Sequence, residues 1–150
     1  MTHASIRQRI AVPPQQAWAV LSALADWPRW CPTISRLEIL DAASPGLGSK
    51  AYIEQPGLRP ALWTVTRWDP EQGFTWESHH PGIRVTGDHR IAPVTGGCDV
   101  ELSLSFTGLL GAMLGPWLRT VARKAMAREA HALMCACEGR PAEPCRDPTC

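Results

Sequence analysis

The stretch near the C-terminus, residues 116–138, constrains the fold more than any other part of the chain. After Pro116 it contains neither glycine nor proline, and it is rich in Ala, Leu, Met and Arg, which favour helix. Proline tolerates the first turn of a helix, so Gly115 and Pro116 are typical of a helix start. Gly139 is typical of a helix end. The sequence therefore predicts a long helix, which needs a large apolar surface to pack against.

The predicted helix has an apolar face and a cationic face. At ~100° per residue, seven mostly small side chains share the apolar face. They are Leu118, Val121, Ala122, Ala125, Ala132, Leu133 and Ala136. Arg119 and Arg123 lie on the opposite face, and Lys124 and Arg128 flank it. Because the apolar face is made of small residues, another element or molecule can approach this helix closely.

Upstream of the helix the hydrophobic pattern changes to strict alternation, which is typical of strands. The clearest case is segment 98–107, where Val100, Leu102 and Leu104 alternate with polar residues. Short turns rich in Gly and Pro separate the segments, which indicates antiparallel hairpins. Strands are predicted over 5–12, 36–40, 49–55, 61–68, 74–79, 83–92 and 98–107. A helix over 15–25 and a short turn over 26–32 follow the first strand.

The composition is that of an ordinary globular protein, with 45% hydrophobic and 19% charged residues. A formal net charge of +1 argues against nucleic-acid binding. No apolar run reaches about 18 residues, so no transmembrane segment is predicted. The N-terminus has no apolar signal core, and we therefore expect a cytoplasmic protein whose six cysteines are reduced.

We predict a single domain over residues 1–138 and a flexible tail, rich in Cys and Pro, over 139–150. An antiparallel sheet with one apolar face must cover that face, and only the final helix is long enough to do so. The expected fold is α+β. In it, a curved antiparallel sheet of about seven strands wraps around the C-terminal helix, with one or two short helices after the first strand.

A series of motifs between residues 4 and 138 resembles the pattern of a known superfamily. In chain order they are Val12-Pro13-Pro14 with Ala17-Trp18, Asp26-Trp27-Pro28-Arg29-Trp30 with Pro32, Gly48, Trp63-Thr64-Val65-Thr66 with Asp69-Pro70, Phe74-Thr75-Trp76, His89, Gly97-Cys98-Asp99-Val100, and Glu129 with Leu133 and Glu138. Their order and spacing resemble the START-like superfamily, also called SRPBCC, in its polyketide cyclase/dehydrase-like branch. The resemblance implies a helix-grip (START/Bet v 1-like) fold with an apolar cavity between the sheet and the last helix.

Members of that superfamily bind lipids, sterols, polyketides, quinones or plant hormones, and a minority are enzymes. The resemblance therefore implies a hydrophobic small-molecule ligand, and our first hypothesis is a carrier or binding protein. The alternative is a polyketide cyclase/aromatase-like enzyme in which His89 is the acid/base. A third hypothesis is a module that binds a partner through the arginine face of the helix. A monomer and a homodimer both remain open.

Two polar residues stand out by the phase of their side chains. His89 is in step with Ile83 and Val85, so it faces the cavity if they do. Glu129 lies in the middle of the apolar helix face, where a carboxylate needs a partner because an isolated buried charge is costly. We predict that the two residues lie within hydrogen-bonding reach and form a catalytic or ligand-orienting pair. The structural alternative is a histidine bonded to a backbone carbonyl and an ion pair of Glu129 with Arg67.

The other predicted cavity residues are apolar or aromatic. Trp63 and Trp76 belong to an aromatic wall, whereas Trp68 falls on the other phase and is expected at an edge or on the outer face. Met113 lies in the glycine-punctuated segment 109–114, which fits either an entrance or a loop that closes one end of the core. The predicted ligand-binding set is Trp63, Val65, Phe74, Trp76, Val85, His89, Leu102, Leu104, Met113, Trp117, Val121 and Ala125.

No metal site and no cofactor are predicted. Cys135, Cys137, Cys145 and Cys150 lack the paired spacing of a structural zinc site. On a helix, Cys135 and Cys137 point ~200° apart, so they cannot both ligate one ion unless the helix ends before them. The sequence also lacks a nucleophile elbow, a P-loop and an HExxH motif, so any catalysis is expected to be acid–base chemistry or templating of a cyclisation, and not covalent attack.

Overall fold

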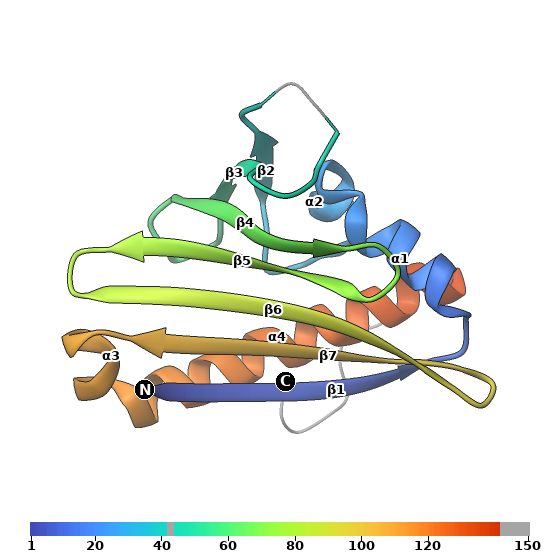
Figure 1. The fold of residues 1–150 in the computed structure, drawn as a ribbon. Helices are drawn as coiled ribbons and strands as arrows, with labels where there is room; N and C mark the ends of the chain where they lie inside the picture. Colours follow the sequence, from blue (N-terminus) through green and yellow to red (C-terminus); the bar gives the residue numbers. More distant parts are fainter. Residues whose placement is uncertain (42–43, 142–150) are drawn as a thin grey trace.

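The computed structural model describes residues 1–41 and 44–141. Its centre is a seven-stranded antiparallel sheet in the spatial order β1-β7-β6-β5-β4-β3-β2 (Figure 1). The strands are β1 Thr2–Ile10, β2 Arg36–Ile39, β3 Lys50–Glu54, β4 Ala61–Asp69, β5 Gly73–His80, β6 Ile83–Val94 and β7 Gly97–Thr107. Strands β2 to β7 pair in sequence order as a meander, and β1 pairs with β7 at one edge. The seven predicted strands are confirmed.

The helices are α1 Pro14–Ser22, α2 Trp27–Trp30, α3 Leu109–Met113 and α4 Gly115–Glu138, with a 3-10 turn at Leu24–Asp26. The helix expected over 15–25 is shorter than predicted, because Ala23 leaves the helical conformation. The segment expected as an entrance or a closing loop forms the short α3. No helix among the described residues combines the length and apolarity needed to cross a membrane.

The long α4 runs along one face of the curved sheet, which we call the inner face (Figure 1). Its buried side chains include Ala122, Met126, Ala130 and Leu133, at the spacing of one helix face. Gly139 ends the helix in the left-handed conformation, at φ +66°. The fold predicted from the sequence, a curved antiparallel sheet that grips a C-terminal helix, is confirmed.

A β-bulge in β4 corrects two predictions. Val65 pairs with Trp76, but Arg67 pairs with Thr75, so one extra residue interrupts the ladder and reverses the phase of the rest of the strand. Trp68, expected at an edge or on the outer face, therefore packs on the inner side against Phe74, with ring centroids 5.5 Å apart.

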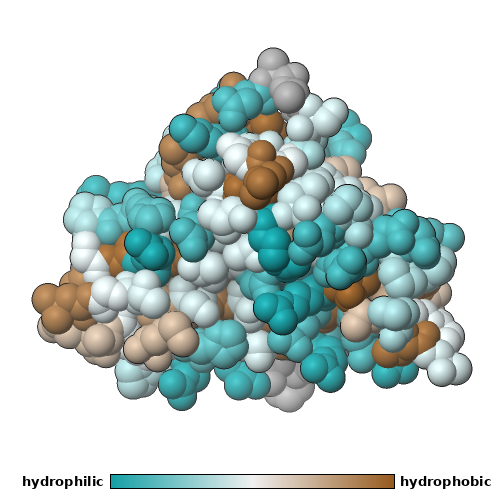
Figure 2. Space-filling view, in the orientation of Figure 1, coloured by the Kyte–Doolittle hydropathy of each residue, from teal (hydrophilic) through white to brown (hydrophobic). Residues whose placement is uncertain are grey.

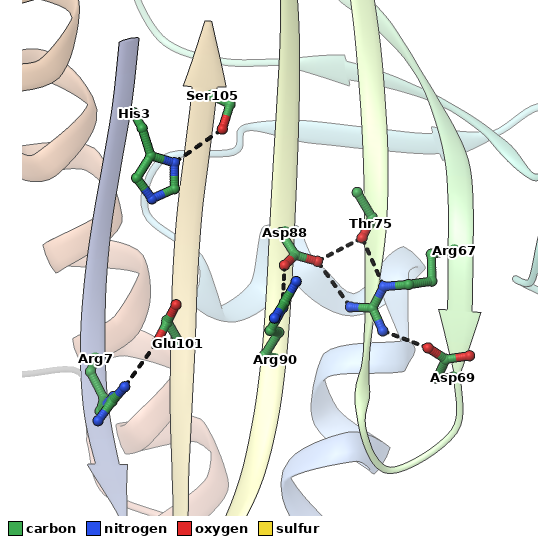
Figure 3. A network of polar contacts seen from close by, with 9 residues as sticks. All are labelled: His3, Arg7, Arg67, Asp69, Thr75, Asp88, Arg90, Glu101 and Ser105. Atoms are coloured by element: carbon green, nitrogen blue, oxygen red, sulfur yellow. Dashed lines mark hydrogen bonds and ion pairs between the residues drawn. The ribbon is translucent and has the colours of Figure 1, made fainter. Parts of the chain in front are cut away.

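Arg67 is turned to the outer face by the same bulge and does not pair with Glu129. It instead forms ion pairs with Asp69 and with Asp88, the latter at 2.9 Å, and Thr75 donates to Asp88 at 2.6 Å (Figure 3). Burial alone would raise the pKa of Asp88, but hydrogen bonds from Thr75, Arg67 and Arg90 outweigh it and hold that pKa below its usual value. This network ties β4, β5 and β6 together on the side away from α4.

Gly73 is the position in the sheet that leaves the least room for a side chain. Its φ is +130°, and a Cβ there would lie 1.8 Å from the backbone oxygen of His89. We predict that Gly73→Ala lowers the free energy of unfolding by about 2–4 kcal/mol, measured by urea denaturation. Gly46→Ala is the control, because nothing lies within 4 Å of that position. Equal stability of the two variants would contradict the prediction.

Candidate functional site

A cavity of about 360 Å³ lies between the inner face of the sheet and the N-terminal half of α4. Strands β3 to β7 form one wall, α4 forms the other, and residues after α2 and in the β3–β4 loop complete it. The walls are mainly aliphatic and aromatic. A few polar side chains, among them His89 and Glu129, interrupt them. This combination of an apolar wall and few polar groups is typical of small-molecule sites.

The buried polar pair consists of His89 on β6 and Glu129 on α4. Nε2 of His89 lies 3.2 Å from Oε1 of Glu129, and only 6% and 17% of the two side chains are exposed. The hydrogen-bonding contact predicted from the sequence is therefore present. Which of the two atoms donates depends on the tautomer of His89.

Aromatic rings hold the imidazole in place. Phe74 stacks on His89, with centroids 4.3 Å apart and planes 15° from parallel. The edges of Trp27 and Trp76 meet it at 5.4 and 5.6 Å. Trp27 is itself fully buried and donates from Nε1 to the Leu21 backbone oxygen. The side-chain geometry of His89 is thus fixed by packing as well as by Glu129.

Two buried polar atoms at this site have no hydrogen-bond partner within residues 1–41 and 44–141. They are Nδ1 of His89 and Nε1 of Trp63. An unpaired buried donor or acceptor costs about 1–3 kcal/mol. Both residues line the cavity, but these two atoms are themselves covered by neighbouring groups.

Gly87 sets the position of the aromatic wall. It lies between Val85 and His89 on β6, and a Cβ there would meet the Trp76 Nε1 at 2.6 Å. The indole of Trp76 can therefore lie directly over the strand. Trp63 packs beside it, with centroids 5.3 Å apart, and together they form the aromatic surface of the cavity.

Most residues of the predicted site line the cavity. Both members of the predicted catalytic pair do so, and so do nine of the twelve predicted ligand-binding residues, His89 being in both sets. Those nine are Trp63, Trp76, Val85, His89, Leu102, Leu104, Trp117, Val121 and Ala125.

Three predicted residues, Val65, Phe74 and Met113, do not line the cavity. Val65 and Phe74 are buried in the core, where Phe74 lies behind the imidazole that it stacks on. Their alternation places them on the inner face, but neighbouring side chains separate them from the open space. Met113 is 68% exposed on α3.

Several lining residues were missed by the sequence analysis. Leu58 and Arg59 come from the β3–β4 loop, and Thr33 and Ile34 from the segment after α2. Loop residues carry no periodic signal, so no pattern places them at a cavity. Other missed residues, such as Leu118, Ala122 and Met126, lie on the apolar face of the helix, where their spacing could have placed them at the cavity.

Cys31 lies near the pair but is not a usable nucleophile. Its Sγ contacts Thr33 Oγ1 at 3.2 Å. Burial, and then the carboxylate of Glu129, raise the pKa of this thiol to about 12, so it stays protonated at neutral pH. Of the four cysteines considered for metal binding, Cys145 and Cys150 lie outside the described residues.

A curved antiparallel sheet, a long covering helix and a cavity between them define a helix-grip domain of the START type. The chain belongs to the family described as polyketide cyclase/dehydrase and lipid transport, whose model matches residues 1–138. The family predicted from the sequence is therefore confirmed.

Individual known proteins also resemble this chain in sequence or in fold. Toxin Rv0910 of Mycobacterium tuberculosis is 26% identical over 111 residues, which cover 71% of this chain and 76% of that protein. The structure of a START superfamily protein from Mycobacterium smegmatis has a TM-score of 0.76 at 16% identity, covering 93% of this chain and 99% of that one. The Zhui aromatase/cyclase from Streptomyces sp. R1128 has a TM-score of 0.70 at 18% identity, covering 91% and 93%. At these identities the two structures establish the fold.

Proposed function

We propose that this protein binds a hydrophobic small molecule, lipid-like or ring-containing, that carries one hydroxyl or carbonyl group. The observation that carries the proposal is the cavity of about 360 Å³, apolar around a single buried His–Glu pair. That volume is within the range of about 300–1,000 Å³ found for small-molecule pockets. The family, which includes polyketide cyclases and lipid transport proteins, supports this class of ligand.

The walls suggest how the ligand would be held. Trp63 and Trp76 offer a broad aromatic surface on the sheet side, and Ala125 leaves room on the helix side. A ligand hydroxyl can donate to the Glu129 carboxylate, which is the more exposed member of the pair. When Nε2 of His89 carries a proton, a ligand carbonyl can share that N–H with Glu129. The pair would therefore fix the orientation of an otherwise apolar molecule.

Filling the cavity should abolish binding. We predict that the fluorescent probe N-phenyl-1-naphthylamine binds the wild-type protein and that Ala125→Phe weakens its affinity at least tenfold, because the new ring occupies the site. The control is Ala19→Phe, an exposed position on α1. Probe titrations measure the affinities, and thermal melts check folding. Equal affinity of the two variants, or no binding to the wild-type protein, would refute the cavity as a ligand site.

The polar pair should discriminate between ligands. We predict that wild-type protein binds 1-naphthol about tenfold more tightly than naphthalene, because only the former can hydrogen-bond to Glu129. The double variant His89→Phe/Glu129→Met should lose this preference and still fold, since replacing both partners by apolar groups leaves no buried group unpaired. Displacement of N-phenyl-1-naphthylamine gives both affinities. A preference that survives in the double variant would contradict the assigned role of the pair.

An enzyme that uses the same cavity is the alternative function. The observation that favours it is the aromatic packing around His89, which holds an imidazole and a carboxylate in one orientation. In this alternative His89 takes a proton from the carbon beside a ligand carbonyl and later returns it, as a polyketide cyclisation requires. Glu129 would orient the ring and stabilise the imidazolium. No covalent intermediate is needed.

Proton transfer can be tested without knowing the natural substrate. If the alternative holds, the protein should accelerate hydrogen–deuterium exchange at the methyl group of 2-acetylnaphthalene in D₂O, measured by NMR. His89→Gln should reduce the acceleration by about 10²-fold or more while the affinity for N-phenyl-1-naphthylamine stays within twofold. Exchange at the buffer rate in the wild-type protein would exclude this alternative and leave the binding function in place.

A further inference from the structure

Large apolar side chains are exposed together at one end of the molecule. We call this surface the α3–α4 patch; its members are Leu109, Leu110, Met113, Leu114, Trp117 and Val121. Leu109 is 72% exposed and Trp117 is 62% exposed. Figure 2 shows hydrophobic side chains gathered over the end of the molecule where α3 lies. Contiguous exposed apolar surface of this kind is typical of an interaction site.

Cations accompany the apolar residues on α4. Trp117, Val121, Lys124 and Arg128 are spaced i, i+4, i+7 and i+11, so they form one stripe of the helix, and all four are exposed. Residues 102–128 contain no Asp or Glu. Within the described part of the chain, neither Lys124 nor Arg128 forms an ion pair. The stripe thus combines an aromatic anchor with unpaired positive charge, although the whole chain carries a net charge of only +1.

The patch adjoins the opening of the cavity. Trp117 and Val121 belong to the patch and also line the cavity, and Leu58 and Arg59 line it from the β3–β4 loop while remaining exposed. The Leu110 backbone N–H donates to the Gly82 oxygen at 3.1 Å, which fixes α3 against the β5–β6 turn. The rim of the cavity is therefore apolar, positively charged and open to the outside.

We propose that the α3–α4 patch docks the protein on an anionic lipid bilayer, with the mouth of the cavity facing the membrane. Trp and Leu side chains enter the headgroup region, and Lys124 and Arg128 contact acidic headgroups through long stems that reach past the apolar side chains. Docking needs no bound ligand and goes beyond the proposed function. Transfer of a ligand from the bilayer through this mouth rests on the proposed function.

The positive charge of the α3–α4 patch favours an anionic bilayer over a second copy of the chain as the binding partner. In a two-fold symmetric dimer the same surface meets itself, which would bring Lys124 and Arg128 of both copies together without any carboxylate on the stripe. An anionic bilayer offers both the negative charge and an apolar layer. An acidic protein partner offers the charge alone and is one of the outcomes that the experiment separates.

Vesicle co-sedimentation tests the proposal with the whole chain. We expect binding to vesicles of 70% phosphatidylcholine and 30% phosphatidylglycerol at 50 mM NaCl, and at least tenfold weaker binding to pure phosphatidylcholine or at 500 mM NaCl. Leu109→Glu should weaken binding at least tenfold. Leu47→Glu is the matched control, because Leu47 is 73% exposed in the loop between β2 and β3, far from α3 (Figure 1). Lys124→Gln should weaken binding more than Lys50→Gln on β3.

Each outcome of these experiments supports or overturns docking on the bilayer. No binding of wild-type protein to anionic vesicles, equal binding to neutral vesicles, or equal loss in Leu47→Glu would overturn docking, as would a dimer in sedimentation velocity that Leu109→Glu dissociates. Neither Leu109 nor Leu47 lines the cavity, so both variants should keep their affinity for N-phenyl-1-naphthylamine if they fold. Vesicle binding without any binding of this probe would support docking and refute the proposed function instead.

Discussion

An apolar sheet face has to be covered, and in this protein the helix that covers it has mostly small side chains where it makes contact. Ala122 and Ala130 are buried on the face of α4 that packs on the core, and the helix contacts β1 and β7. Farther toward the C-terminus Leu133 closes the core. The cavity lies over the N-terminal half of α4, whereas core side chains of α1 and α2, such as Leu21 and Trp27, pack near the other end of the helix (Figure 1).

Burying the polar pair of His89 and Glu129 at the cavity costs free energy, so its presence needs an explanation. A buried imidazole and carboxyl group lose their hydration, and the hydrogen bond between them offsets that loss only in part. An apolar pair of similar size at His89 and Glu129 would serve the core as well or better. The aromatic rings around the imidazole hold it in one orientation, which a purely structural residue does not need. Both observations favour a role in ligand or proton chemistry.

The sequence predicted the position of a side chain correctly wherever hydrophobic periodicity determines the face on which it lies. Alternation along β6 placed His89 on the inner face, helical spacing placed Glu129 opposite it, and the two do meet. Periodicity failed at Arg67 and Trp68, because a bulge adds one residue without disturbing the alternating pattern of residue types. It also missed Leu58 and Arg59, which reach the cavity only because the meander returns their loop to the mouth. Contacts of this kind depend on tertiary structure and leave no local signal.

The pairing of β1 with β7 has a consequence for how the molecule is made. Thr2 lies opposite Phe106, so the first strand to leave the ribosome has no partner until almost the whole sheet has been synthesised. Such long-range pairing slows folding, and an unpaired strand is prone to aggregate while it waits. The strands from β2 to β7 can assemble as consecutive hairpins in the meantime. Translation speed and chaperone access, rather than equilibrium stability alone, would then set how much of this protein a cell obtains.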